Sequence, residues 1–314
     1  MTDDATLKRV LVPIDTSEVA ERAIPWAKAV AGSTSEVILL VVVPVATAVR
    51  SIGGQIIGSA ETIQTGYQQM AESQLAAAIE KWFSPGDAVR TAVAKGDPGE
   101  QILAVAEAED ADLIVMSSHG RGAIGRFVSG SVADRVVRHA AVPVMVVGPE
   151  GDLSENATID RIVAPVDNSE LSLASLPTAA QLAAATNVPV FVIHVVTPAD
   201  DYLVTFPATA GTIPPSAVDA SLSQQIEMGH SLVETAIARL KDRGVGAQGT
   251  VFTGSPGSAI VSQLKQGDVV VLSSHQREGL ARWVLGSTSM KLIRNGEAPV
   301  VIVTRESIER SRGD

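Results

Sequence analysis

Two stretches of this chain are copies of one another, and this repeat constrains the fold more than any other feature. Residues 112–147 align with residues 268–303 without gaps, and 14 of the 36 aligned pairs are identical. Such self-similarity indicates an internal duplication. The 314 residues are enough for two domains of ordinary size. We therefore predict one domain over residues 1–148 and a second over 159–304, separated by a polar stretch with Gly and Pro.

Both halves alternate short apolar runs with segments of helical periodicity. This alternation predicts parallel strands joined by helical crossovers, and an aromatic content of only 3% suits strands built from Val, Ala, Ile and Leu. The predicted fold class is α/β, with two tandem Rossmann-like domains, each a five-stranded parallel sheet with helices on both faces. The predicted strands are 10–14, 37–43, 88–94, 113–117 and 144–147 in the first half, and 162–166, 190–196, 247–252, 269–273 and 300–303 in the second.

The segments between the strands carry weaker signals. Ser17 or Thr16 is expected to cap a helix that runs to about Ala31 and is interrupted at Pro25, because proline removes a backbone donor. The connections 44–66 and 197–218 are rich in Gly, Ser, Pro and Thr, which is typical of loops or flaps. The charged tail 304–314 is expected to fray.

Composition excludes several classes of function. The net charge of −11 argues against a basic nucleic-acid surface, and the absence of cysteine excludes disulfides, thiol nucleophiles and cysteine zinc sites. No apolar run approaches the roughly 18 residues of a membrane span, and the N-terminal residues lack an apolar signal core. We expect a cytoplasmic protein that binds neither nucleic acid nor membrane.

The loop inside the repeat carries the clearest chemical signal. The strand at 113–117 leads through Ser and His to Gly130-Ser131 and a further helix. Glycine lets the backbone approach phosphate, and free amides at a helix start favour an anion. Arg121 adds positive charge, whereas Asp15 follows the first strand and suits the nucleoside end, since a carboxylate repels phosphate. Because parallel strands end at one edge, the pattern predicts a nucleotide site there.

This pattern resembles the universal stress protein family in its tandem two-domain form. Nucleotide-binding members carry G-x2-G-x9-G-(S/T) after the fourth strand, and the first half here has S-S-H-G-(RGAIGRFVS)-G-S. The resemblance implies a sheet like that of the adenine nucleotide alpha hydrolases and ATP, with or without Mg²⁺, as the ligand. It implies that Gly120, Gly130, Ser131 and the amide of Val132 hold the phosphates, that the Ser117 region meets the ribose, and that Asp15, the Val42 backbone, Pro13 and Gly96 surround the adenosine.

The second half departs further from the family pattern. It has Ser273 and Gln276 at the two leading Gly positions, and Glu278 adds negative charge. A long side chain and a carboxylate both oppose a triphosphate, so we predict a degenerate copy that packs against the first domain as a partner subunit would. The positions that it keeps are Pro165, Asp167, Val195, Gly254, Gly286 and Ser287.

Structural explanations of the same residues stay open. Gly120 and Gly130 could simply turn the chain, and Ser131 could serve as a helix N-cap. Asp15 could be a helix-start carboxylate, and Arg121 could be a solvated surface residue. Ser117, which replaces the first Gly of the motif, either crowds the ribose or offers it a hydroxyl.

Three functions are therefore compatible with the sequence. The first is a stress-response or signalling protein that binds an adenine nucleotide without efficient catalysis, although weak ATP hydrolysis stays open. The second is a slow ATP hydrolase or adenylyl-transfer enzyme, which the absence of a G-x4-G-K-(S/T) loop and of lysine in the candidate loop disfavours. The third is an interaction module that has lost nucleotide binding. The expected partners are an unidentified protein and either a second copy, in a homodimer, or the other half of the same chain.

Overall fold

The chain forms two compact units, each described separately below. The computed structural model describes residues 7–15, 17–50, 56–118, 131–148, 157–198, 215–273, 287–295 and 298–313. The N-terminal unit spans Leu7–Thr158 together with the residues from Glu306 onward, and the C-terminal unit spans Ile159–Arg305.

The N-terminal unit is a parallel sheet covered by helices on both faces. Its sheet strands are β1 (Arg9–Pro13), β2 (Glu36–Val43), β5 (Val89–Lys95), β6 (Leu113–Ser117) and β7 (Val144–Val147), and its helices are α1 (Glu18–Glu21), α2 (Ala23–Ala31), α3 (Ala60–Trp82), α4 (Pro98–Ala108), α5 (Ser131–His139) and α12 (Arg305–Gly313). The order is β7-β6-β1-β2-β5, and neighbouring strands are parallel. Helix α2 contacts β1 and β6, and α3 contacts β2 and β5.

The C-terminal unit repeats this plan. Its strands are β8 (Arg161–Pro165), β9 (Val190–Val196), β10 (Ala247–Thr253), β11 (Asp268–Ser273) and β12 (Val300–Val303), and its helices are α6 (Glu170–Ala174), α7 (Leu176–Thr186), α9 (Pro215–Lys241), α10 (Pro256–Val261) and α11 (Ser287–Asn295). The order is β10-β9-β8-β11-β12, again with parallel neighbours. The predicted α/β fold class, with a five-stranded parallel sheet in each half, is confirmed.

Buried apolar strands form both cores. Val10, Leu11 and Val12 of β1 have no exposed area, and all residues of β6 and β7 are buried. Strands that are covered on both faces lack a polar side, which explains why they stand out in the sequence as continuous apolar runs. The predicted strand ends accordingly agree with the structure to within one residue at almost every position.

The predicted interruption near Pro25 lies a little earlier than expected. Ser17 caps α1 by accepting a hydrogen bond from the amide of Ala20 at 3.2 Å, and the helix ends at Glu21. Proline crowds the carbonyl four residues before it, which here belongs to Glu21. Pro25 itself is the third residue of α2, where its missing N–H has no intrahelical acceptor to lose.

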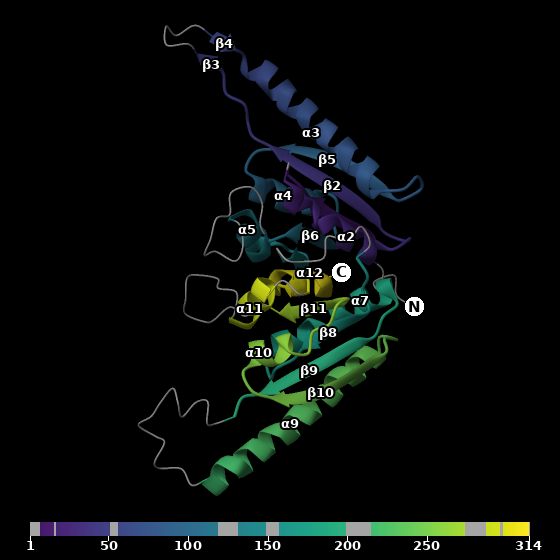
Figure 1. Cartoon of the computed structure of the whole chain (residues 1–314), viewed down its shortest axis with the longest axis vertical. Helices are drawn as coiled ribbons and strands as arrows, with labels where there is room; N and C mark the ends of the chain where they lie inside the picture. The colour runs from purple at the N-terminus through teal and green to yellow at the C-terminus, as the bar shows by residue number, and fades with distance from the viewer. Residues whose placement is uncertain are drawn as a thin grey trace. The chain divides into compact units, whose positions relative to one another are not determined.

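The loop prediction for residues 44–66 is wrong in part. Helix α3 already begins at Ala60, since Ser59 accepts a hydrogen bond from the amide of Thr62 at 3.1 Å. Before it, β3 (Val49–Arg50) and β4 (Ile56–Gly58) form an antiparallel pair. Figure 1 shows α3 running along β2 and β5 and continuing past them toward this pair. The matching prediction for 197–218 is wrong at its end, where α9 begins at Pro215.

The predicted fraying of the tail 304–314 is also wrong. The segment forms α12, and Ile308 is only 5% exposed. Arg310 lies 3.4 Å from the carboxylate of Asp110 in the same unit. The burial of Ile308 thus anchors a helix whose charged composition had suggested a frayed tail.

Candidate functional site

The N-terminal sheet has its topological switch point between β1 and β6. The chain proceeds from β1 to β2 on one side and returns to β6 on the other, so the loops after β1 and β6 diverge there. Because these strands are parallel, their carboxyl ends share one edge. The structure brings to this edge the predicted residues Pro13, Asp15, Val42, Gly96 and Ser117.

Asp15 organises the turn that follows β1. Its Oδ1 accepts hydrogen bonds from the amide of Ser17 at 2.8 Å and from the Ser17 hydroxyl. In the C-terminal unit, Asp167 accepts the same pair of bonds from the amide and hydroxyl of Ser169, at 2.9 and 2.5 Å. The carboxylate therefore has a structural role at the helix start in both units. Its presence alone does not distinguish a binding site from a degenerate copy of one.

Val42 and Gly96 lie next to one another at the outer end of the edge. Val42 is half-buried in β2 and pairs with Ala94 of β5, and the Gly96 amide donates to the carbonyl of Val43 at 3.0 Å. Gly96 has φ +138°, which disfavours any residue with a side chain. A Cβ there would also stand 3.2 Å from the Gln101 amide. The Gln101 side chain therefore already lies beside Gly96, and the positive φ is the main reason for a glycine there.

The turn after Gly96 is connected to α5. Asp97 caps α4 by accepting from the amide of Glu100 at 3.1 Å, and Arg135 of α5 donates to the same carboxylate at 2.6 Å. The hydrogen bond from the backbone amide of Glu100 lowers the pKa of Asp97 below its usual value, and the hydrogen bond and positive charge of Arg135 lower it further. The middle of α5 is thus joined to the start of α4 by a solvent-exposed charged contact.

The remaining predicted residues lie on both sides of a segment outside the described residues. Ser117 is the last residue of β6 and is only 8% exposed, while Ser131 and Val132 are the first two residues of α5. The start of this helix has the free amides that suit an anion. The remaining predicted phosphate residues, Gly120, Arg121 and Gly130, lie outside the described residues, as do Gln276, Glu278 and Gly286 of the second copy.

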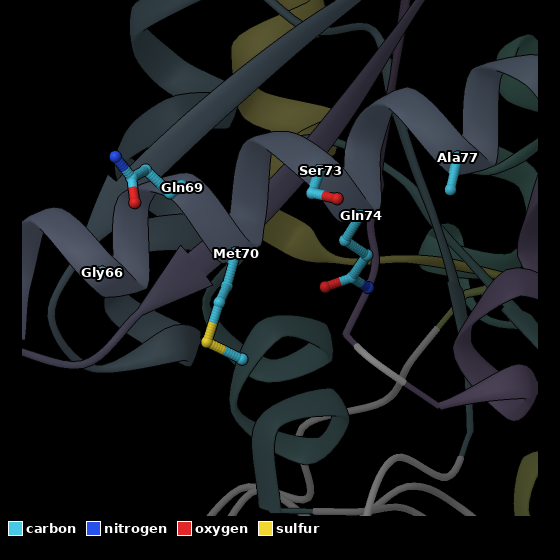
Figure 2. A pocket seen from close by; sticks show the side chains of 6 residues that line it. All are labelled: Gly66, Gln69, Met70, Ser73, Gln74 and Ala77. Atoms are coloured by element: carbon cyan, nitrogen blue, oxygen red, sulfur yellow. The ribbon is translucent and has the colours of Figure 1, made fainter.

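Sequence reasoning missed one residue of this edge, Gln74 of α3. Its amide nitrogen donates to the backbone carbonyl of Asp15 across 59 positions of sequence. It also lines a hollow along one face of α3, shown in Figure 2. No local pattern marks Gln74, since it lies in a largely polar helix. The hollow is lined by Gly66, Gln69, Met70, Ser73, Gln74 and Ala77.

The C-terminal unit completes the matching edge differently. The carbonyl of Asp167 accepts from the Ser172 hydroxyl at 2.7 Å, and the amide of Asp167 donates to that hydroxyl at 3.1 Å. Buried His194 of β9 has its Nδ1 2.8 Å from the carbonyl of Val166. Gly229 of α9 makes room for this ring, because a Cβ there would stand 2.6 Å from its Cδ2. The donor to the aspartate carbonyl is thus local in this unit, whereas in the N-terminal unit it comes from α3.

The described part of the chain offers neither a metal-binding cluster nor a membrane-spanning helix. Within it, no group of three or more His, Asp or Glu side chains is arranged to hold a metal ion. The helices described there include none that is long and apolar enough to span a bilayer.

Comparison with known proteins gives a consistent result. The sequence model of the Universal stress protein family matches residues 6–148 and again 158–304. A universal stress protein of Mycolicibacterium smegmatis is 24% identical over 307 residues, covering 96% of this chain and 99% of its own. One from Methanocaldococcus jannaschii is 33% identical over 144 residues, covering 45% of this chain and 81% of its own. The crystal structure of a universal stress protein from Archaeoglobus fulgidus covers 97% of this chain and 100% of its own, with a TM-score of 0.62 and 20% identity.

Proposed function

This chain belongs to the universal stress protein family, and from that premise we propose that its N-terminal unit binds one adenine nucleotide, with ATP as the ligand. In this proposal the protein acts in stress response or signalling, in the cytoplasm, through an unidentified protein partner. The C-terminal unit is a degenerate copy that binds no nucleotide. The protein functions either as a homodimer or with its two halves as the pair.

The observation that carries this proposal is the convergence at the switch point. Asp15, Val42, Gly96 and Ser117 lie at the ends of adjacent parallel strands, and α5 starts with Ser131 on the same chain segment that follows β6. Carboxylate and backbone groups suit a nucleoside, and a helix start suits phosphate. Gly96, whose φ of +138° disfavours any residue with a side chain, lies at the same edge.

The residues at this edge suit the binding of ATP better than they suit the catalysis of phosphoryl transfer. Ser131, the amide of Val132 and the predicted Gly120, Arg121 and Gly130 would receive the phosphates, and Mg²⁺, where present, would neutralise their charge. Phosphoryl transfer needs positioned cationic groups, yet the candidate loop contains no lysine. We therefore propose a binding protein without efficient catalysis.

One observation favours a second candidate, an interaction module without nucleotide. Ser117 stands where the family motif has glycine, and it is 8% exposed. Its Cβ and hydroxyl then occupy space at the ribose end of the edge, which would weaken or abolish binding.

Release of bound nucleotide tests the two candidates. The purified protein should release about one adenine nucleotide per chain on denaturation, or show a rise in unfolding temperature with millimolar ATP, because a ligand of the folded state stabilises it. Gly130→Val should abolish that rise by placing a side chain in the phosphate path. Gly286→Val, the matched change in the second copy, should leave it unchanged. Absence of both bound nucleotide and thermal shift in the wild type would favour the interaction module.

A further inference from the structure

We propose that Met70 is a site of reversible oxidation by a hydroperoxide, and that its sulfoxide releases the turn at Asp15 from α3. A sulfoxide reductase returns the modified side chain to the thioether. The inference goes beyond nucleotide binding and does not depend on it. It rests on three observations: the exposure of Met70, the contact that Gln74 makes one helical turn later, and the different residue at that place in α9.

The thioether of Met70 is open to solvent. Met70 is 66% exposed, whereas Met116 and Met145 are buried in β6 and β7. Long side chains on a helix lean toward the preceding turn, and the residue four positions before Met70 is Gly66. Among the described residues, no other side chain lies within 4 Å of the place where a Cβ of Gly66 would stand. An oxidant can therefore reach the sulfur without any change in the packing of the core.

Oxidation changes the hydrogen-bonding character of this side chain. The sulfur attacks the hydroxyl oxygen of the hydroperoxide, so an S–O bond forms and the O–O bond breaks. The other oxygen takes the proton and leaves as water or an alcohol, while the sulfur loses two electrons and the peroxide gains them. A thioether is a weak acceptor, whereas the sulfoxide is polar and presents an oxygen that accepts hydrogen bonds.

Gln74 is the residue that meets the new oxygen. It lies four positions after Met70, so the two side chains are neighbours on one helix face, and both line the hollow along α3. Its NH₂ donates to the Asp15 carbonyl, because a carbonyl only accepts hydrogen bonds. The carboxamide oxygen of Gln74 faces the other way, and Figure 2 shows it on the side of Met70. A sulfoxide at Met70 therefore sets two acceptors against each other.

A half-turn of the Gln74 carboxamide relieves this repulsion. It brings the NH₂ to the sulfoxide and leaves the carboxamide oxygen facing the Asp15 carbonyl, where two acceptors cannot form a hydrogen bond. The turn after β1 then loses the donor that α3 supplies. The bonds from the amide and hydroxyl of Ser17 to the Asp15 carboxylate stay in place. We therefore expect this turn and α1 to open more often after oxidation, while the unit stays folded.

The C-terminal unit contains a matched pair that lacks this connection. At the spacing that relates Gly96 to Gly254, the buried residues of α3 align with buried residues of α9: Ala71 with Gly229, Leu75 with Val233 and Ala78 with Ala236. At the same spacing Met70 corresponds to Met228, which is 54% exposed, and Gln74 corresponds to Leu232. Leucine has no carboxamide to turn, and the Asp167 carbonyl accepts from Ser172 instead. Oxidation of Met228 should therefore leave the turn at Asp167 unchanged.

Graded oxidation of the full chain with hydrogen peroxide, followed by peptide mass spectrometry, tests the site. Met70 and Met228 should gain oxygen about tenfold faster than Met116 and Met145, because exposure governs the oxidation of a thioether. Hydrogen exchange of the oxidised chain then tests the turns. The amides of 17–21 should exchange about fivefold faster, the loss of about one hydrogen bond, whereas those of 169–174 should not change. Treatment with methionine sulfoxide reductases should restore the original exchange.

Three variants assign the effect to the two side chains. Met70→Leu keeps an apolar side chain that peroxide does not oxidise, so exchange at 17–21 should no longer respond. Met228→Leu is the matched control and should respond like the wild type. Gln74→Leu installs the residue of the other unit, so its turn should exchange faster from the start and show no further change with peroxide.

Two kinds of result would overturn the inference. If Met70 gains oxygen no faster than Met116 and Met145, its thioether is not an accessible site. If Met70 is oxidised but exchange at 17–21 stays the same, or rises equally in Met70→Leu or further in Gln74→Leu, the sulfoxide does not act through Gln74. All of these measurements use the chain without added nucleotide, so their outcome is separate from that of the nucleotide-binding tests.

Discussion

In the N-terminal unit the carbonyl of Asp15 accepts from Gln74 of α3, whereas in the C-terminal unit the carbonyl of Asp167 accepts from Ser172 of α6. The turns themselves are alike, since each aspartate binds the amide and hydroxyl of the serine two positions later. The aspartate–serine contact is therefore common to both turns, and the donor to the aspartate carbonyl is the part that differs. In the N-terminal unit the donor reaches across from the neighbouring helix α3, whereas in the C-terminal unit Ser172 closes the turn locally.

The two units also differ in a buried pair of residues, one on a strand and one on the long helix that covers it. Val41 of β2 and Ala71 of α3 are buried in the N-terminal unit, and their counterparts at the equivalent positions are His194 and Gly229. The larger ring on the strand is matched by the smaller residue on the helix. We therefore expect His194 and Gly229 to be coupled in stability, as a pair that was repacked together after duplication.

The largest expected effect concerns a buried ion pair of the C-terminal unit. Asp268 is 1% exposed and holds the Arg161 guanidinium through two hydrogen bonds of 2.7 and 2.8 Å. Asp268→Ala should reduce the free energy of unfolding by about 3–5 kcal/mol, because the arginine is left without its buried partner. Hydrogen-exchange mass spectrometry of β11 peptides would measure the loss in this unit directly.

The matched variant in the N-terminal unit is Asp112→Ala. Asp112 accepts from the backbone amides of Lys8 and Arg9, at 2.7 and 2.8 Å, rather than from a buried guanidinium. Loss of those bonds should cost about 1–3 kcal/mol. Equal losses in the two variants would contradict the distinction between a charge pair and a backbone cap.

A smaller effect is expected from the repacked pair. Gly229→Ala should destabilise the C-terminal unit by about 1–3 kcal/mol, because the new Cβ meets the His194 ring at 2.6 Å and Val251 at 3.2 Å. Adding His194→Val recreates the Val and Ala combination of the other unit and should restore most of the loss. Unfolding of the wild type, both single variants and the double variant forms a cycle, and additive effects would show that the two residues were not repacked together.

The sequence predicted the strands of the sheets more completely than it predicted the contacts at the candidate site. Covered strands such as β6 and β7 are continuous apolar runs, so their limits could be found from hydrophobicity alone. Helix α3 was partly missed because most of its residues are polar and its start depends on one cap, Ser59. Gln74 could not be found at all, since its significance comes from a carbonyl 59 positions away and from a comparison with Leu232 that needs aligned helices.

The smallest expected effect tests the charged contact between α4 and α5. In the C-terminal unit the residues at these positions are Ser255, Ser258 and Lys291, and the lysine is bonded to Ser258 at 2.5 Å. Asp97→Ser would give the N-terminal unit the uncharged cap of its counterpart. It should lower the unfolding temperature slightly at neutral pH, because the Arg135 contact is exposed to solvent.

The pH dependence separates this contact from simple loss of a helix cap. Folding lowers the pKa of Asp97, so its contribution to stability is fully present above the ordinary carboxyl pKa and disappears as the pH falls through the lower folded value. The difference in unfolding temperature between wild type and Asp97→Ser should therefore shrink below about pH 4. A difference that stayed constant from neutral to acidic conditions would mean that the carboxylate charge contributes nothing. In that case the start of α5 is positioned by packing alone, and the two units do not differ in how they hold this helix.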